Sequence, residues 1–100
     1  MLQYAHGWPR TIVLRRGAQD DAFSFNVAID DFQYKVTVNE DYWQSLTGGK
    51  ITPEELVRRS FAFLLEREGP ESILREFDLT VIGRYFPEYE ETIHLQMMGI

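Results

Sequence analysis

The chain has 100 residues, 44% of them hydrophobic, and sixteen acidic against ten basic residues give a formal charge of −6. This composition excludes a chain that is disordered throughout, and the acidic balance argues against a generally basic nucleic-acid surface. Cysteine is absent, which excludes disulfides, thiolate metal sites and thiol catalysis and is compatible with the cytoplasmic location that we expect.

The N-terminal part of the chain carries only weak structural signals. Gly7 and Pro9 interrupt the first ten residues, so we expect residues 1–10 to form a flexible arm. No apolar run is long enough for a signal peptide or a membrane span, and we expect no membrane partner. Residues 12–15 are compatible with a short edge strand, and residues 17–21 are typical of a loop.

Residues 22–38 predict a β-hairpin, because large apolar side chains alternate with small or polar ones in two consecutive runs. A turn at Asp30–Asp31 brings every large apolar side chain onto one face of the hairpin. A hairpin with one apolar face is marginal alone and needs a covering helix. The predicted cross-strand pairs are Ile29–Phe32, Val27–Tyr34, Phe25–Val36 and Phe23–Val38.

A short helix is expected between Asn39, a good N-cap, and the glycines at 48–49. Tyr42, Trp43 and Leu46 fall on one face of this helix because they are three and four residues apart. The simplest interpretation is that Trp43 closes one end of the hydrophobic core. The alternative is an aromatic platform for a ligand or partner.

Residues 53–68 carry the strongest helix signals in the chain. Thr52 is placed to cap the first turn, Pro53 suits the first position, and Glu55 is placed to complete a capping box. We expect Gly69 to end the helix in a left-handed conformation. The apolar side chains cover an arc of roughly 200°, wider than a surface helix needs, so this helix requires cover on two sides. They are Leu56, Val57, Phe61, Phe63, Leu64 and Leu65.

The polar arc of the same helix carries two arginines and two glutamates. Glu54 precedes Arg58 and Glu55 precedes Arg59 by four residues, the favourable order for ion pairs on a helix. Each such pair contributes only about 0.2–0.5 kcal/mol. These pairs therefore keep the helix soluble but do not hold the fold together.

The segment after Pro70 predicts two further helical stretches. Ile73, Leu74 and Phe77 have helical spacing, and a second helix is expected over residues 79–86 with Asp78 as its cap. The β-branched residues at 80–82 leave a strand as the alternative for this second stretch.

Pro87 disfavours a helical conformation for Phe86 and is suited to start a last helical turn. In that turn Tyr89 and Ile93 are expected to face inward. Residues 95–100 are expected to fray or to dock on a neighbouring molecule.

These elements predict a small α+β fold. The antiparallel hairpin, extended to three strands if the N-terminal edge strand joins it, packs on a small bundle of helices centred on residues 53–68. Neither a repeat nor a linker divides the chain, so we expect a single domain over residues 11–94.

No catalytic motif is present in the sequence. His6 and His94 lack metal-binding spacing, and the phosphate-loop, dinucleotide and nucleophile-elbow patterns are absent. The five acidic doublets do not form chelating pairs by themselves, because adjacent side chains point in different directions. We therefore predict no catalytic, cofactor-binding or metal-binding residues and no cofactor. A carboxylate-dependent metal enzyme is the weakest of the alternatives.

The sequence favours a non-enzymatic protein-interaction module that binds a protein partner or a second copy of itself. The reasons are the excess apolar arc of 53–68, the aromatic residues at 85–89 and the methionine-bearing tail, since methionine and aromatic side chains are common at contact surfaces. The candidate partner-binding residues are Trp43, Arg58, Arg59, Tyr85 and Tyr89.

The main alternative is a regulator that binds nucleic acid through Arg58 and Arg59. A hairpin followed by a Thr-Pro-Glu-Glu helix start is broadly similar to small bacterial antitoxins. The similarity includes no diagnostic motif, and sixteen acidic residues would repel phosphate along an extended footprint. We therefore rank nucleic acid below a protein partner.

Overall fold

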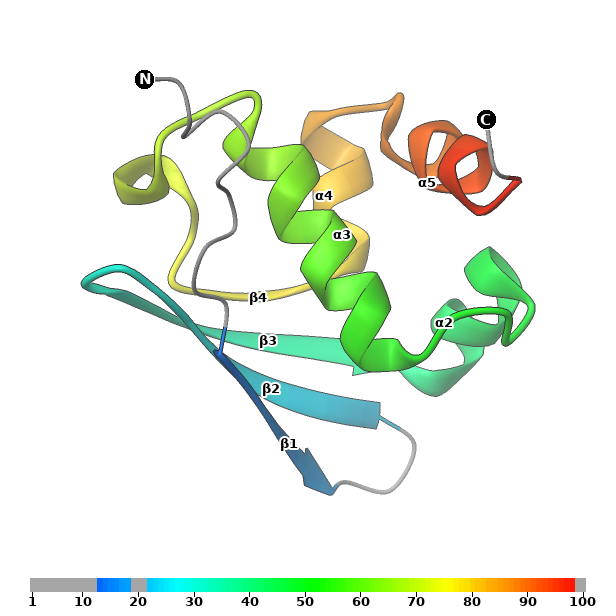
Figure 1. Ribbon diagram of the computed structural model, residues 1–100, viewed down its shortest axis with the longest axis horizontal. Coiled ribbons are helices and arrows are strands. Elements are labelled where there is room, and N and C mark those ends of the chain that lie inside the picture. The colour runs from blue at the N-terminus through cyan, green and yellow to red at the C-terminus, as the bar shows by residue number, and fades with distance from the viewer. Residues whose placement is uncertain (1–12, 19–21, 99–100) are drawn as a thin grey trace.

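The computed structural model describes residues 13–18 and 22–98, so the expected arm at residues 1–10 lies outside the described part. The described residues form four strands in one mixed sheet of order β1-β2-β3-β4 (Figure 1). The first three strands are antiparallel neighbours, and β4 runs parallel to β3. The strands are β1 (Val13–Ala18), β2 (Ala22–Ile29), β3 (Phe32–Asn39) and β4 (Glu76–Asp78).

The helices of the described part lie on one face of this sheet (Figure 1). They are α2 (Glu40–Thr47), α3 (Pro53–Leu65), α4 (Thr80–Tyr85) and α5 (Tyr89–Met97), together with the 3-10 turn η1 (Pro70–Ser72). This arrangement confirms the predicted small α+β fold. Within the described residues, none of these helices is long and apolar enough to cross a membrane.

The predicted hairpin is confirmed in its turn and in its register. β2 and β3 turn at Asp30–Asp31, and all four predicted apolar pairs lie opposite each other. Asp30 has a φ of 53°, in the left-handed region that Asp tolerates better than most residues.

The predicted edge strand at residues 12–15 is confirmed for the described residues and is longer than expected. β1 continues to Ala18, so the prediction of a loop over 17–21 is wrong for Gly17 and Ala18. These two residues pair with Ser24 and Phe23 of β2. Backbone pairing with a preformed neighbour outweighs the local preference of glycine for a turn.

The short helix after the hairpin has the predicted caps. The side chain of Asn39 accepts a hydrogen bond from the backbone N–H of Tyr42 at 3.2 Å, and Gly48 ends α2 with a φ of 64°. Leu46 is buried in the core, while Tyr42 and Trp43 are partly buried and pack against it.

The central helix begins as predicted but ends three residues early. Thr52 Oγ1 accepts from the Glu55 N–H at 3.0 Å. Glu55 does not complete a capping box, because its carboxylate turns toward Arg58 and Arg59. Gly69 has a φ of −75° and begins η1, so its predicted role as a left-handed helix end is wrong.

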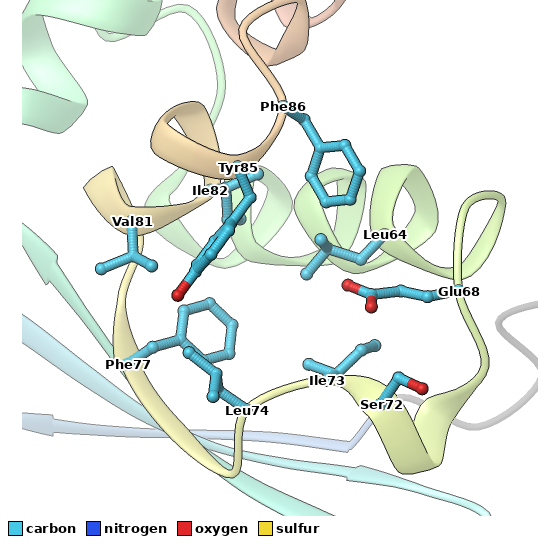
Figure 2. Close-up of a pocket in the computed structure, with 10 residues that line it drawn as sticks. All are labelled: Leu64, Glu68, Ser72, Ile73, Leu74, Phe77, Val81, Ile82, Tyr85 and Phe86. Carbon is cyan, nitrogen blue, oxygen red and sulfur yellow. The ribbon is translucent and has the colours of Figure 1, made fainter.

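The prediction of a helix at residues 73–77 is also wrong, because this segment leads into β4. Lys35 N–H of β3 donates to the Arg75 carbonyl at 2.7 Å, and Leu79 N–H donates to the Thr37 carbonyl at 2.9 Å. The free edge of β3 supplies these partners, which no local periodicity reveals. Figure 2 shows this segment running from η1 past Leu74 to Phe77.

The helix predicted over residues 79–86 is confirmed as α4, although Leu79 and not Asp78 occupies its cap position, while the last helix begins at Tyr89 and not at Pro87. α4 is a helix, and the Asp78 carboxylate accepts from the Thr80 N–H at 3.0 Å. Phe86 is extended before Pro87, and Tyr89 and Ile93 are fully buried.

Part of the predicted tail belongs to a helix. Residues 95–97 form the last turn of α5, and Met97 packs against the core. The domain limits at residues 11 and 94 and the docking of residues 95–100 on a neighbour stay predictions.

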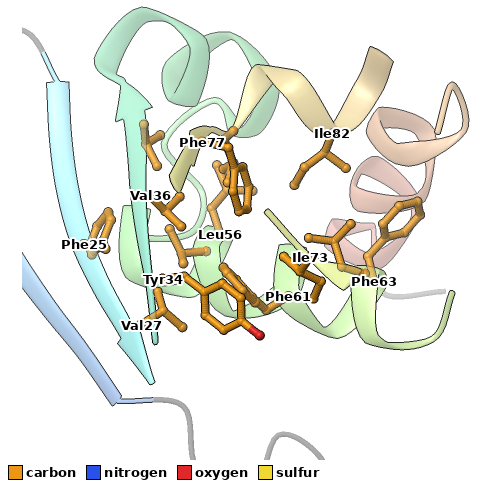
Figure 3. Close-up of a cluster of buried hydrophobic side chains, with 14 of the residues drawn as sticks. Phe25, Val27, Tyr34, Val36, Leu56, Phe61, Phe63, Ile73, Phe77 and Ile82 are labelled. Atoms are coloured by element: carbon orange, nitrogen blue, oxygen red, sulfur yellow. The ribbon is translucent and has the colours of Figure 1, made fainter. Parts of the chain in front are cut away.

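The core forms on both sides of α3, as its wide apolar arc requires (Figure 3). On the sheet side, the Phe61 ring lies 5.2 Å from that of Tyr34 and 5.9 Å from that of Phe77. On the other side, the rings of Phe63 and Tyr89 are 5.2 Å apart. α3 therefore joins the sheet to α5.

Candidate functional site

A pocket of about 290 Å³ lies at the C-terminal end of α3, where this helix meets the η1 region, β4 and α4 (Figure 2). Its walls are mainly apolar. Leu64 comes from α3, Ile73 from the segment after η1, Phe77 from β4 and Ile82 from α4. These four side chains are buried, so the wall of the pocket is continuous with the hydrophobic core.

The pocket exists because the elements around it are short. β4 has three residues and α4 has six, and the chain between α3 and β4 holds only the three-residue η1. Such short elements cannot cover the last turn of a 13-residue helix as completely as two eight-residue strands cover its other turns.

Two large apolar side chains at the pocket are open to solvent. Leu74 is 50% exposed and Tyr85 is 68% exposed, and both line the pocket. In Figure 2 they project from opposite sides, Leu74 from the segment before β4 and Tyr85 from α4. An exposed apolar surface beside a concavity is typical of a contact site.

Glu68 is the only ionisable carboxylate among the lining residues. Its side chain is partly buried and extends into the pocket toward Leu64 and Ile73 (Figure 2). It makes no hydrogen bond or ion pair within the described residues. The other polar side chains of the lining are the hydroxyls of Ser72 and Tyr85.

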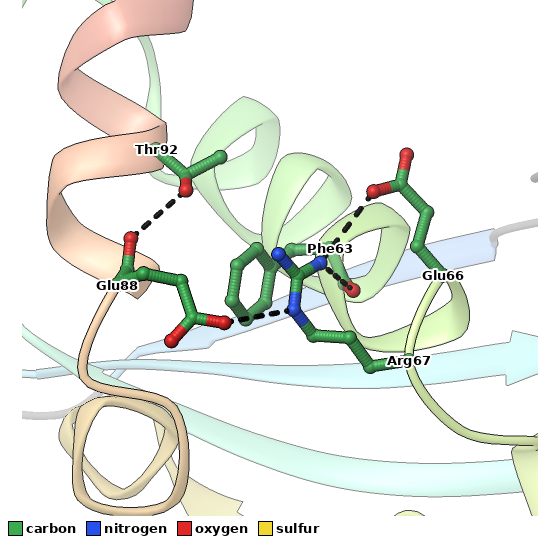
Figure 4. A network of polar contacts seen from close by, with 5 residues as sticks. All are labelled: Phe63, Glu66, Arg67, Glu88 and Thr92. Atoms are coloured by element: carbon green, nitrogen blue, oxygen red, sulfur yellow. Dashed lines mark hydrogen bonds and ion pairs between the residues drawn. The ribbon is translucent and has the colours of Figure 1, made fainter.

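Arg67, which follows α3 in the chain, connects the end of α3 to the residue that precedes α5 (Figure 4). Arg67 lies with its guanidinium 3.6 Å from the centre of the Phe63 ring and donates to the Phe63 carbonyl at 3.0 Å. It also donates to the Glu88 carboxylate at 3.2 Å, while Thr92 Oγ1 donates to the Glu88 carbonyl at 2.8 Å. The end of α3 is thereby tied to the start of α5.

The pKa of the Glu88 carboxyl group reflects its contact with Arg67. Its own backbone N–H and, next, Arg67 donate to the carboxylate and lower its pKa. Because the pair is exposed at the surface, it orients the chain rather than adding much stability.

Of the five candidate residues from the sequence, Tyr85 is the one at the pocket. Trp43 lies elsewhere: its Nε1–H donates to the Ile51 carbonyl at 2.9 Å, and its ring packs edge-on against Phe23 at 5.8 Å. These contacts fit the interpretation in which Trp43 closes one end of the core.

Tyr89 is not available to a partner, which corrects its choice as a candidate. Its side chain is fully buried, and its hydroxyl bonds to Ser60 Oγ. Because Ser60 Oγ donates to the Leu56 carbonyl at 2.7 Å, the Tyr89 hydroxyl is the donor of the pair. Burial raises the pKa of Tyr89.

Arg58 and Arg59 lie on the polar face of α3 and do not line the pocket. The Arg59 guanidinium is 2.9 Å from the Glu55 carboxylate, and that of Arg58 is 3.5 Å from it. The predicted pair of Glu55 and Arg59 is thus confirmed. A phosphate would have to compete with this carboxylate for both arginines.

Sequence reasoning missed Glu68 and Leu74. Glu68 was assigned to the end of a helix, and Leu74 to the apolar face of another. The available signal was the sequence between Glu68 and Phe77, in which a glycine and a proline precede two aliphatic residues. Such a segment is poorly suited to one continuous helix.

The described residues do not bring three or more histidine, aspartate or glutamate side chains together as a metal site. No family model matches this chain, and comparisons with curated proteins and with solved structures find no similar protein. The proposed function therefore depends on the geometry of the pocket.

Proposed function

We propose that this protein is a non-enzymatic protein-interaction module that binds its partner through the pocket between α3, β4 and α4. The observation that carries the proposal is the apolar pocket of about 290 Å³ with Leu74 and Tyr85 exposed beside it. A bulky side chain of a partner would bury apolar surface on both residues, and such burial drives association.

The pocket is large enough for a bulky side chain of a partner and lies at the lower limit of the range for small-molecule sites. A dry cavity of about 150 Å³ accepts a benzene molecule, whereas pockets for drug-sized ligands occupy roughly 300–1,000 Å³. At about 290 Å³, the pocket suits one aromatic side chain or two aliphatic ones.

The polar groups of the pocket support binding more than catalysis. A nucleophile needs a base within hydrogen-bond reach, oriented by a third group. Within the described residues, no hydrogen bond joins Glu68, Ser72 and the Tyr85 hydroxyl to one another. One carboxylate and two hydroxyls without mutual contacts can orient a ligand but do not form an activated pair.

The proposal is tested with a phage-displayed library of random 12-residue peptides, selected on the immobilised full chain. Affinities of the selected peptides are then measured by fluorescence anisotropy. The variant Leu74→Ser/Tyr85→Ser should bind them at least about tenfold more weakly, as expected when two apolar anchors are lost. Its stability should stay within about 0.5 kcal/mol of wild type, because both side chains are largely exposed.

A matched control is available on α5. Leu95 is 44% exposed and Met98 is 67% exposed, and neither lines the pocket. The variant Leu95→Ser/Met98→Ser removes similar apolar surface and should change the affinity by less than about twofold. Equal losses in both variants, or enrichment of no peptide, would contradict the proposal.

Sedimentation velocity over a hundredfold range of concentration tests whether the partner is a second copy of the chain. A mass that rises with concentration in wild type but not in Leu74→Ser/Tyr85→Ser identifies a homodimer through the pocket. If the chain is monomeric at every concentration, the partner that binds at the pocket is a different protein.

A further inference from the structure

We infer that the partner segment carries a lysine or arginine beside the apolar residue that fills the pocket, and that Glu68 binds this basic side chain. This inference rests on the proposed function and defines the chemical class of the partner. The feature that supports it is a carboxylate that extends into an apolar pocket (Figure 2).

The Glu68 carboxylate is the group in the pocket that most needs a ligand. It is partly buried among Leu64 and Ile73 and makes no ion pair within the described residues. A basic side chain brought beside this carboxylate would form a charge-assisted hydrogen bond that has no counterpart in the described part of the free chain.

Nearby arginines of the same chain are engaged elsewhere or face solvent. Arg67 is held by Phe63 and Glu88, and the guanidinium of Arg75 lies over the ring of Phe32 at 5.2 Å. Arg84 is exposed on α4. Within the described residues, none of these side chains forms an ion pair with Glu68.

The net charge of the chain also favours a basic partner. Exposed Glu71 and Glu76 adjoin lining residues in the chain, and so do exposed Arg75 and Arg84, so both signs of charge flank the pocket. The chain as a whole has a formal charge of −6. The field of an acidic protein attracts a cationic segment and repels an acidic one, including a second copy of this chain.

The pocket therefore selects for two features that are close together in the partner. One is a leucine, methionine or aromatic side chain that contacts Leu74 and Tyr85. The other is a basic side chain that reaches Glu68. A segment with only the apolar feature would leave the carboxylate desolvated and unpaired, which lowers affinity and provides specificity.

The test begins with the peptides selected on the wild-type chain, which should be rich in lysine or arginine beside an apolar residue. The variant Glu68→Gln keeps the shape of the side chain and removes its charge. It should bind these peptides about five- to tenfold more weakly, as expected for a partly desolvated ion pair. The control Glu91→Gln changes the net charge equally at an exposed residue of α5 outside the pocket and should change affinity less than about twofold.

A substitution in the peptide provides a second measurement that does not depend on the folding of a variant. Replacing the basic residue of the peptide by glutamine should weaken binding to the wild-type chain by the same factor. The same replacement should have almost no further effect on binding to Glu68→Gln, because the interaction is already lost.

The outcomes separate this inference from the proposed function. Peptides that lose affinity for Leu74→Ser/Tyr85→Ser but bind Glu68→Gln normally would overturn the basic partner and keep the pocket as the binding site. Peptides that are insensitive to both changes would overturn both proposals, as would enrichment of no peptide. Selected peptides without lysine or arginine would overturn the inference alone.

Discussion

The two parts of α3 differ in how completely the rest of the chain covers them. Leu56, Val57 and Phe61 have no exposed surface, and Figure 3 shows Leu56 and Phe61 beside the long strands of the hairpin. Leu64 and Glu68, at and beyond the last turn, border a pocket of about 290 Å³. The apolar side chains of α3 are therefore fully covered where they meet the long strands, which we call the closed part. They border a solvent-accessible pocket where they meet the short elements, which we call the open part.

This difference shows how a small domain can contain both a core and a binding site on one helix. The closed part supplies stability through complete burial. The open part keeps apolar surface accessible beside the Glu68 carboxylate, which forms no ion pair within the described residues. Substitutions at matched positions in the two parts should therefore have different effects.

The largest expected effect is the removal of a large side chain from the closed part. Phe61→Ala should cost about 3–5 kcal/mol in the free energy of unfolding, because it leaves a cavity between the sheet and α3. Leu64→Ala should cost less, about 2–3 kcal/mol, because the space it leaves joins an existing pocket. Urea unfolding followed by circular dichroism measures both values.

A Phe61→Ala variant within about 0.5 kcal/mol of wild type would contradict the central role of α3. A larger cost for Leu64→Ala than for Phe61→Ala would contradict the difference between the two parts.

A smaller effect is expected from adding one methylene group in the closed part of α3 and one in the wall of the pocket. Val57→Leu enlarges a fully buried side chain and should destabilise the fold by about 1–3 kcal/mol through overpacking. Val81→Leu enlarges a partly buried residue of the pocket wall. It should stabilise the fold by up to about 0.8 kcal/mol, because the added group buries apolar surface in free space.

The two substitutions should change the free energy of unfolding in opposite directions. Thermal or urea unfolding of both variants measures these changes. Val81→Leu should also weaken binding of the selected peptides, since it reduces the space for a partner side chain. Destabilisation by both variants would show that the pocket wall is as tightly packed as the core.

An effect of similar size at neutral pH concerns the polar pair between α3 and α5. Tyr89→Phe removes the hydroxyl that donates to Ser60 and should cost about 1 kcal/mol at pH 7. Burial raises the pKa of Tyr89 above its ordinary value of 10.0, and the hydrogen bond to Ser60 opposes this only in part.

The folded state therefore keeps a proton that the unfolded chain loses above about pH 10. The associated stability is fully present below that pH and is lost as the pH rises toward the folded pKa, by up to about 1.4 kcal/mol per pH unit. Urea unfolding between pH 8 and about 11.5 should show a shallower decline for Tyr89→Phe than for wild type. Burial also raises the pKa of Tyr42, whose partly buried phenol donates to Glu90 at 2.8 Å, and that of Tyr34, so both curves decline and the expected difference lies in the slope. Identical slopes would contradict the role assigned to Tyr89.

The sequence by itself determined the elements whose signals are local. The alternation of residues 22–38 specifies the register of the hairpin, because a slip by one residue would turn every apolar side chain to the wrong face. The caps at Asn39 and Thr52 define where α2 and α3 begin, because each satisfies a backbone N–H within three residues.

Only the tertiary structure decided the segment from Glu68 to Asp78. β4 forms because Lys35 and Thr37 of β3 offer hydrogen-bonding partners, and these lie about forty residues earlier in the sequence. The same pairing leaves Leu74 exposed and forms the pocket. The spacing of the apolar residues placed Leu74 on the face of a helix. This prediction was wrong because spacing along the chain contains no information about which distant backbone groups are free to pair. Tyr85 and Tyr89 were both candidate partner-binding residues, but contact with Ser60 and Phe63 buries Tyr89, while Tyr85 on the short α4 stays at the surface of the pocket.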